Sequence, residues 1–321
     1  MNHQEKGIFM KISHGIYPTM LVAYKTNGEI DYEAMGRLIE WYIQEGVHGI
    51  FALCQSTEIL CLSLEERMSL GKFVMDKVGG RVPVVMSGVT ANTLEGQIEE
   101  ARLIASLKPD ALVLLSNLID DDEHNTLIQK VEILLEAIPK DIPLGIYEIP
   151  VPYKRLITDE ELTFMAKSGR FAFIKDTCCD MEIMRRRAEI VRGLDFGLFN
   201  ANAATVLDTL RIGYAGFSGI MANIHPSLYV WLFENRTSPL ADRIIHYLAM
   251  TSVIEARCYP IIAKRYLREY MGLPITDVCR TVKETNVPAV AYELRAVYEL
   301  TKEAKKIAGI GSFPEIQKIP S

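Results

Sequence analysis

The chain has 321 residues, of which 49% are hydrophobic, so it is long enough for one large barrel or two ordinary domains with a sizeable core. Its net charge of −6 and its lack of a long Lys/Arg run argue against a nucleic-acid partner. It has neither a signal-sequence pattern nor an apolar stretch of about 18 residues, so we expect no membrane partner and a cytoplasmic location.

Short β-branched or apolar runs alternate with longer amphipathic segments between about residue 14 and residue 220. This alternation is typical of parallel strands joined by crossover helices. Eight strands are predicted, and eight is the number that closes a (β/α)8 barrel. The predicted strands are 17–24, 49–54, 82–88, 111–116, 142–148, 171–176, 195–200 and 214–220.

The segments between the predicted strands carry helix start signals. Ser63 can cap a helix, and Glu66 stands at the capping-box position. Three further segments begin with a side chain that can accept a hydrogen bond from the first helical turn. The further N-cap candidates are Asp31, Asn92 or Thr93, and Thr158.

Beyond residue 224 the strand candidates stop and four helical segments follow. Their apolar positions, such as Leu248 and Ile261, are too many to leave in water, so these helices should pack on the barrel or on another subunit. We therefore predict an α/β protein: a (β/α)8 TIM barrel over residues 1–224 and a C-terminal all-helical extension over residues 225–321.

Chemistry in such a barrel lies at the C-terminal ends of the strands. The polar residues predicted at those ends are Gln55, Ser56, Thr57, Glu58, Ser87, Ser116, Asn117, Tyr147, Glu148, Lys175, Asp176, Asn200, Asn202 and Ser218. No CxxC pair occurs among the 6 cysteines and no HExxH or HxH pattern among the 6 histidines, so we expect reduced thiols and no metal site.

Lys175 is the strongest candidate for chemistry. It follows four apolar residues in FAFIKD, so its stem should run through the barrel and its amine should reach the mouth. Burial lowers the pKa of an ammonium group, normally about 10.4, and a free amine can attack a ketone to form an imine. A lysine here can equally pair with Asp176 or with a strand carbonyl, and position alone does not separate these interpretations.

Tyr147 and the turn at 54–58 are the other candidates. The Tyr147 hydroxyl ends the fifth predicted strand and could move protons at the amine, although a tyrosine there is often a packing residue. The turn places backbone N–H groups and the hydroxyls of Ser56 and Thr57 where they could hold a carboxylate. The same string is also typical of an ordinary polar loop.

Together these segments resemble the dihydrodipicolinate synthase/N-acetylneuraminate lyase family over nearly the whole chain. The family's Y-N-x-P is similar to the sequence from Tyr147 to Pro150, and its Schiff-base motif (I/V)-K-(D/E)-(S/T) is similar to IKDT around Lys175. The separation of 28 positions between Tyr147 and Lys175 is the family's own. The G-(T/S)-T-G-E turn resembles segment 54–58, and the family's eighth-strand glycine motif resembles 213–226.

The resemblance implies a divergent class I aldolase that forms an imine on Lys175 with Tyr147 beside it, uses no cofactor and assembles as a homotetramer or homodimer. It implies a lyase that cleaves or forms a carbon–carbon bond next to a 2-keto acid, most simply pyruvate. The substrate-binding residues that it suggests are Gln55, Ser56, Thr57, Glu148, Ser218 and Gly219.

Several positions depart from the family pattern. Cys54 and Thr57 replace both glycines of the turn and Gln55 replaces its first hydroxyl residue, so the carboxylate pocket should be reshaped. The family's second tyrosine, after the fourth strand, is missing in LSNL at 115–118, and its arginine after Y-N-x-P falls near Pro152. We therefore expect inefficient synthesis of dihydrodipicolinate.

Glu148 replaces the family's usual asparagine beside the tyrosine. If its carboxylate points inward, it would favour a cationic or hydroxyl-rich substrate and stabilise a protonated imine. Otherwise it faces solvent or pairs with Lys154 or Arg155.

Four functions follow from these observations. The leading one is a Schiff-base lyase or aldolase for a 2-keto acid of sugar-acid type, and the second is a dehydratase of the same superfamily that shares the imine but eliminates water. The third is a catalytically degenerate family member that binds a keto acid or sugar acid as a sensor or partner module, without turnover, and gains thermal stability from the ligand. Dihydrodipicolinate synthase itself, although expected to be inefficient, stays an alternative among the enzymes. The fourth is an unrelated phosphate-binding barrel that uses Gly216 and Gly219.

Overall fold

The computed structural model describes residues 12–119, 126–282 and 288–311. In this part of the chain, eight parallel strands form one sheet in the order β1-β8-β7-β6-β5-β4-β3-β2. A single parallel bridge between Thr19 and Phe51 joins the chain just after β1 to β2 and so completes the circle. The strands are β1 (Gly15–Ile16), β2 (Ile50–Ala52), β3 (Val84–Met86), β4 (Ala111–Leu115), β5 (Leu144–Tyr147), β6 (Phe171–Asp176), β7 (Gly197–Asn200) and β8 (Gly216–Phe217).

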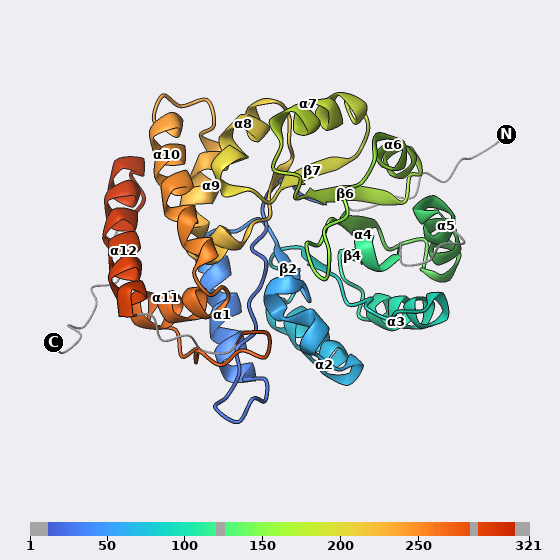
Figure 1. Ribbon diagram of the computed structural model, residues 1–321, viewed down its shortest axis with the longest axis horizontal. Helices are drawn as coiled ribbons and strands as arrows, with labels where there is room; N and C mark the ends of the chain where they lie inside the picture. Colours follow the sequence, from blue (N-terminus) through green and yellow to red (C-terminus); the bar gives the residue numbers. More distant parts are fainter. Residues whose placement is uncertain (1–11, 120–125, 283–287, 312–321) are drawn as a thin grey trace.

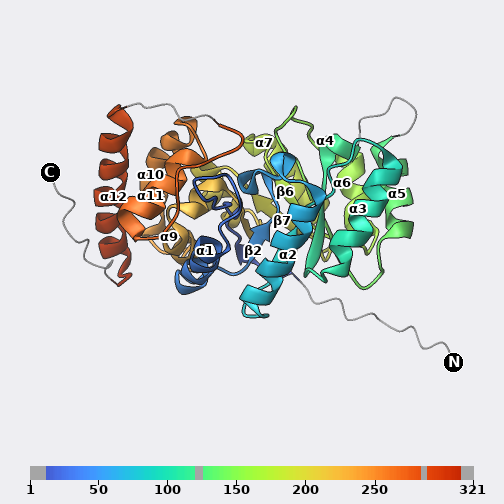
Figure 2. The same ribbon diagram turned by 90° about the horizontal axis from the view of Figure 1, so that it is seen from below.

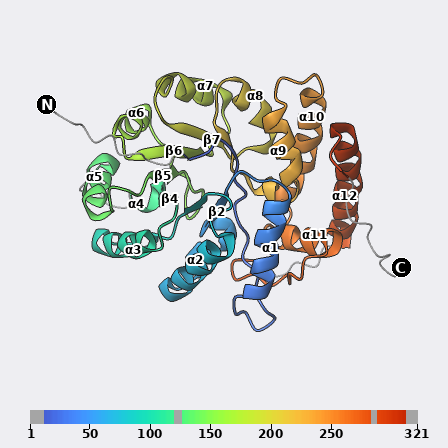
Figure 3. The same cartoon turned by 180° about the vertical axis from the view of Figure 1, so that it is seen from behind.

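Helices surround the strands, as Figures 1 and 3 show from opposite sides. They alternate with the strands along the chain, which confirms the predicted (β/α)8 TIM barrel. The helices up to β8 are α1 (Tyr32–Gln44), α2 (Leu64–Val78), α3 (Leu94–Ser106), α4 (Ser116–Ile119), α5 (Leu127–Ala137), α6 (Asp159–Lys167), α7 (Met181–Ile190) and α8 (Val206–Arg211).

The predicted helix starts lie where the sequence placed them. Ser63 caps α2 and forms a reciprocal capping box with Glu66. The side chains of Asp31, Thr93 and Thr158 accept hydrogen bonds from the first turns of α1, α3 and α6. Each cap satisfies a backbone N–H group that has no partner inside its helix.

The first strand differs from its prediction. The expected strand at 17–24 contains only isolated bridges, and β1 lies just before it at Gly15–Ile16. Pro18 has no backbone N–H to donate to a neighbouring strand, and the chain from residue 17 to residue 24 is nevertheless wholly buried. The apolar run therefore reflects burial more than strand pairing, which is limited here to isolated bridges and a few backbone hydrogen bonds to β2 and β8.

Four helices follow β8: α9 (Pro226–Glu234), α10 (Ala241–Thr251), α11 (Ile261–Met271) and α12 (Pro288–Ala308). They lie on one side of the barrel, with α12 as the outermost (Figure 1), and Figure 2 shows α12 and α5 at opposite ends of the molecule. The rings of Tyr270 and Tyr298 stack at 4.7 Å, which joins α11 to α12. The Tyr247 hydroxyl of α10 donates to the Val297 carbonyl of α12 at 3.2 Å.

The division into residues 1–224 and 225–321 stays a prediction. The α9 helix stands where the eighth helix of the alternation is expected, directly after β8, although it lies beyond residue 224. Residues 1–11 and 312–321, which belong to the two predicted regions, lie outside the described residues.

Alternation along β5 and β6 sends neighbouring side chains to opposite sides of the barrel wall. Phe173 and Tyr147 belong to the cluster that fills the barrel interior, whereas Ile146 and Ile174 pack between the strands and the helices. Gly145 keeps room for this interior: a Cβ at its position would lie 2.4 Å from Cζ of Phe173. The wall thus separates a small interior cluster, to which Tyr147 and Phe173 belong, from the larger core beneath the helices.

No described helix is both long enough and apolar enough to span a bilayer. Among the described residues, no group of three or more His, Cys, Asp or Glu side chains is arranged to bind a metal ion.

Candidate active site

Tyr147 and Lys175 lie side by side at the C-terminal end of the barrel. The two residues pair directly between β5 and β6. The Lys175 amine lies 4.1 Å from the centre of the Tyr147 ring and 5.2 Å from that of Phe51. Residues 28 positions apart in sequence are thus brought into contact by strand register.

The Lys175 side chain is buried, with 4% of its surface exposed. Among the described residues, its amine has neither a hydrogen bond nor an ion pair, and its close neighbours are aromatic rings. Burial lowers the pKa of this amine from 10.5 to about 8, and the nearby Cys54 thiol opposes the shift. At pH 7 about a tenth of the amine is therefore neutral and nucleophilic.

Asp176, the neighbour of Lys175 in sequence, is occupied elsewhere. Its carboxylate lies 2.8 Å from the Arg187 guanidinium of α7 and accepts a hydrogen bond of 2.7 Å from the Tyr214 hydroxyl. Burial by itself would raise the pKa of Asp176, but Arg187 and the backbone N–H of Cys178 outweigh it, so that the pKa is lowered. The alternative that Asp176 pairs with Lys175 is not what the structure shows.

Glu148 also binds Arg187, on the outer side of the barrel wall. Its two carboxylate oxygens lie 2.5 and 3.2 Å from the guanidinium and accept from the backbone N–H groups of Ile157 and Thr177 at 2.8 and 2.9 Å. The side chain is fully buried. This placement gives no support to Glu148 as a substrate-binding residue, and it corrects the expected pairing with Lys154 or Arg155.

The turn after β2 forms the short 3₁₀ helix η1 (Gln55–Thr57). The Gln55 side chain points toward Tyr147, because its Oε1 accepts a hydrogen bond of 3.2 Å from the Tyr147 hydroxyl. The backbone N–H groups of Gln55 and Ser56 have no acceptor among the described residues. They open η1 beside Tyr147, so they could receive a carboxylate there.

The hydroxyl groups of the turn are used internally. Thr57 donates to the Met20 carbonyl at 2.7 Å and accepts from the Cys54 N–H, so it holds the turn in shape. Ser56 donates to Thr19 at 3.0 Å. The left-handed conformation falls on Glu58, whose φ is 56°, and not on Cys54 or Thr57. The expected role of Thr57 in substrate binding finds no support in these contacts.

Tyr259 is a site residue that the sequence did not reveal. It precedes α11, and its hydroxyl donates to Ser56 at 2.7 Å and accepts from Asn223 at 3.0 Å. The sequence predicted a helical segment from Tyr259 onward, and no motif marked the Tyr259 hydroxyl as part of the site. Burial raises the pKa of Tyr259, so the hydroxyl stays protonated.

Ser218 and Gly219 lie at the end of β8. Ser218 lines a void of about 10 Å³ together with Lys175 and Phe199, and its hydroxyl has no hydrogen-bond partner within the described residues. Gly219 lies close to the Phe217 ring, and a Cβ there would lie 2.2 Å from it. Ser218 is thus a free polar group beside the amine, whereas Gly219 is required by packing.

Two asparagines at strand ends are structural. Asn117, which stands where the resembled family has its second tyrosine, donates to the carbonyls of Ile149 and Val151. Asn200 donates to Thr205 and Thr209 and accepts from the Asn202 N–H. Both side chains fix loops through these hydrogen bonds, although the Asn117 Oδ1 has no partner within the described residues.

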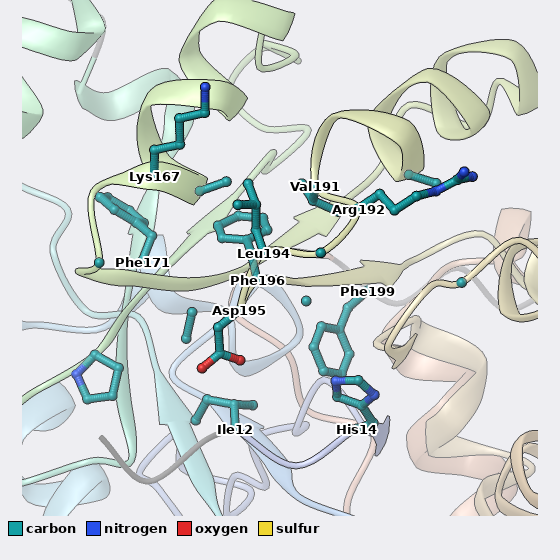
Figure 4. A pocket seen from close by; sticks show the side chains of 18 of the residues that line it. Ile12, His14, Lys167, Phe171, Val191, Arg192, Leu194, Asp195, Phe196 and Phe199 are labelled. Atoms are coloured by element: carbon teal, nitrogen blue, oxygen red, sulfur yellow. The ribbon is translucent and has the colours of Figure 1, made fainter. Parts of the chain in front are cut away.

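A larger cavity of about 700 Å³ lies at the opposite end of the barrel, near the first residues of β6 and β7 (Figure 4). Figure 4 shows Phe171, Phe196 and Phe199 around it and the charged ends of Lys167 and Arg192 pointing outward. No predicted site residue lines it. We place the candidate active site at the other end, where Lys175, Tyr147 and the η1 turn converge.

Solved structures with the same architecture support the fold class. A dihydrodipicolinate synthase from Bacillus anthracis is similar with a TM-score of 0.81 and 19% identity, over 90% of this chain and 99% of that one. A dihydrodipicolinate synthase from Acinetobacter baumannii, complexed with pyruvate, is similar with a TM-score of 0.79 and 22% identity, over 93% and 99%. The chain therefore is a TIM-barrel protein with the helical C-terminal arrangement described above.

Sequence comparison gives the family. The model of the Dihydrodipicolinate synthetase family matches residues 12–306. The 4-hydroxy-tetrahydrodipicolinate synthase of Jannaschia sp. (strain CCS1) is 30% identical over 210 residues, which cover 65% of this chain and 70% of the relative. The chain belongs to the dihydrodipicolinate synthetase family, and this membership makes it an enzyme of the lyase type.

Proposed function

We propose that the protein is a class I lyase that forms a Schiff base between Lys175 and a 2-keto acid, with pyruvate as the simplest. The observation that carries the proposal is a buried amine without a counter-ion, with its pKa lowered to about 8 and a tyrosine paired beside it. Burial of an ammonium group without a partner destabilises a fold, and groups with strongly shifted pKa values are concentrated at functional sites. The pyruvate complex of the similar Acinetobacter baumannii enzyme agrees with this substrate.

The proposed reaction begins when the neutral Lys175 amine adds to the keto carbon. The carbinolamine loses water, and the resulting iminium ion draws electrons from the neighbouring bond. In the cleavage direction the substrate hydroxyl loses its proton, the carbon–carbon bond breaks, an aldehyde leaves and an enamine remains. The enamine then takes up a proton, and water releases pyruvate and the amine.

Tyr147 is the proposed proton carrier. Burial raises the pKa of its phenol well above 10, so the hydroxyl is protonated and acts first as a donor, to the oxygen that leaves as water. Its hydrogen bond to the Gln55 side chain at 3.2 Å orients it. The phenolate left by this step then takes the proton of the substrate hydroxyl as the carbon–carbon bond breaks, and the same oxygen gives that proton to the enamine.

The keto-acid carboxylate is proposed to bind at η1. The N–H groups of Gln55 and Ser56 open this turn without a partner among the described residues, and the Ser218 hydroxyl lies on the other side of Lys175. These groups can replace the water that a carboxylate loses on binding. We keep Gln55, Ser56 and Ser218 as proposed substrate-binding residues.

Synthesis of dihydrodipicolinate is not part of the proposal. Gln55 takes the place of the hydroxyl residue of the family turn, and Asn117 binds loop carbonyls instead of reaching the amine. A homodimer or homotetramer stays a prediction that sedimentation velocity would test.

The deciding experiment is the intact mass of the protein after treatment with pyruvate and sodium borohydride. One reduced pyruvate adduct on the wild type, and none on Lys175→Ala, is the expected result. Analysis of the products from candidate sugar acids then separates cleavage from loss of water. Thermal stabilisation by pyruvate with no adduct would instead indicate a protein that binds the keto acid without chemistry.

A further inference from the structure

A second cavity, of about 430 Å³, lies next to the candidate active site. Its walls come from the η1 turn and the following 3₁₀ helix η2 (Ile59–Cys61), from the loop after β5, from the chain before α11 and from residues 280–282. Gln55 belongs to both places, because it lines this cavity and accepts the hydrogen bond of the Tyr147 hydroxyl. The cavity is therefore separated from Tyr147 by the Gln55 side chain, and the Lys175 amine lies beside the Tyr147 ring.

The charged groups in the cavity wall are already paired within the protein. The Glu58 carboxylate accepts from the Lys264 amine at 3.0 Å and from the N–H groups of Arg280 and Thr281 at 2.6 and 2.7 Å. The Arg280 guanidinium donates to Glu66 at 2.6 and 2.8 Å and to two backbone carbonyls. Neither charge is left over for a ligand.

The hydroxyl groups of the cavity wall are engaged as well. The Tyr259 hydroxyl binds Ser56 and Asn223, and the Thr281 hydroxyl donates to Glu58 at 2.9 Å. A polyhydroxylated chain would thus give up its hydrogen bonds to water and find few replacements here.

The rest of the wall is apolar. Leu60 of η2 and Val151 of the loop after β5 line the cavity and keep 46% and 36% of their surface exposed, which is high for large aliphatic residues. Ile59 and Pro260 complete this surface. An apolar ligand would bury it and remove it from water.

We propose that this cavity holds the substituent of the keto-acid substrate that lies beyond the imine-forming carbon, and that this substituent is apolar, an aryl or branched alkyl group. The inference rests on the proposed function, in which Lys175 holds the keto-acid end. The aldehyde half of the substrate would then be apolar, whereas the sequence led us to expect a hydroxyl-rich sugar acid.

The test compares two ligands with the same keto-acid head on the full chain. Isothermal titration calorimetry measures the affinity for 4-phenyl-2-oxobutanoate and for 2-oxobutanoate, which lacks the phenyl ring. We expect the phenyl compound to bind at least tenfold more tightly. In Leu60→Asp the ratio should fall to about one while 2-oxobutanoate binds as in the wild type.

Leu240→Asp is the matched control. Leu240 is 41% exposed, close to the 46% of Leu60, but it does not line the cavity. This variant should keep the wild-type ratio. Equal affinity for the two ligands in the wild type, lack of binding by the phenyl compound, or an unchanged ratio in Leu60→Asp would each overturn the proposed subsite.

Borohydride trapping with 2-oxobutanoate on the same samples separates this proposal from the proposed function. An adduct without a phenyl preference rejects the subsite and keeps the imine. A phenyl preference that Leu60→Asp removes, without any adduct, rejects the imine and keeps the subsite.

Discussion

Each face of the β5–β6 pair has a buried cationic side chain, but within the described residues the cation on one face has no counter-ion and the cation on the other face has two. On the inner face, the Lys175 amine lies among aromatic rings with no counter-ion in the described part of the chain. On the outer face, the Arg187 guanidinium is held between the carboxylates of Glu148 and Asp176. The residues alternate along each strand, so a shift of one position separates the two environments.

The difference shows how a fold distinguishes a reactive charge from a structural one. A buried ion with partners on every side is stabilised in its charged form, and burial of Arg187 is accordingly outweighed by Glu148 and Asp176, which raise its pKa. A buried ion without partners shifts toward its neutral form, as Lys175 does. The outer network also positions the inner pair, because Glu148 follows Tyr147 directly and Asp176 follows Lys175.

The largest difference in stability is expected between variants that remove either Arg187 or Lys175. Arg187→Met leaves two buried carboxylates without a partner and should lower the free energy of unfolding by about 3–5 kcal/mol. Lys175→Met removes an unpaired charge, so its free energy of unfolding should stay within about 1.5 kcal/mol of the wild-type value or exceed it. Urea denaturation at pH 7 measures both.

Arg186→Met is the control: Arg186 is the neighbour of Arg187 on α7, and the variant breaks its exposed ion pair with Asp159 of α6. It should cost less than about 1 kcal/mol. Equal losses for Arg187→Met and Lys175→Met would contradict the distinction between the two faces.

The pH dependence of stability should also differ between wild type and Lys175→Met. The pKa of Lys175 is lowered from 10.5 to about 8 on folding, so between these values the unfolded chain binds more protons than the folded one. The wild type should therefore gain up to about 3 kcal/mol relative to Lys175→Met as pH rises from 8 to 10.5. Below pH 8 the difference should be constant; a difference that does not change across this window would mean an ordinary lysine pKa.

Tyr147→Phe separates the ring from its hydroxyl. The ring, which contacts Phe51 edge-on at 5.6 Å, is kept, so the environment of the Lys175 amine should be preserved. Imine formation should slow by about 10²-fold or more, since a positioned proton donor is lost. The rate of borohydride-trapped adduct formation measures this effect, and its pH profile should still turn near pH 8.

Tyr17→Phe is the comparison variant for that measurement. Tyr17 also has its ring in the barrel interior, 5.3 Å from that of Phe199, but its hydroxyl binds Ser13. Its trapping rate should equal that of the wild type. A similar slowing in both variants would assign the effect to packing.

The smallest effect is expected for Tyr259→Phe. The variant loses the hydrogen bond to Ser56 and deprives Asn223 of an acceptor, while the ring remains in place. A loss of about 1 kcal/mol, or about fivefold in pyruvate affinity, is expected, because one hydrogen bond at the η1 turn is removed. The pyruvate concentration that gives half-maximal trapping measures it; an unchanged value would remove Tyr259 from the site.

Local patterns in the sequence predicted much of this architecture. The caps at Asp31, Ser63 and Thr158 lie where the helix signals place them, because a cap depends on residues within one helical turn. The FAFIKD segment predicted a strand with Lys175 at its end, and β6 has those bounds. The prediction of a strand at 17–24 was wrong, because a segment that is buried at the end of the barrel has the same apolar sequence as a paired strand.

Contacts between distant residues were decided only by tertiary packing. Glu148 finds its partner 39 positions away on α7, and Tyr259 reaches Ser56 across 203 positions. No periodicity or motif encodes such pairs, since they depend on how a helix lies against the barrel wall. The residue types and the strand alternation place a lysine and a tyrosine on one face, whereas the packing of the remaining chain determines which charges are paired and which amine stays free.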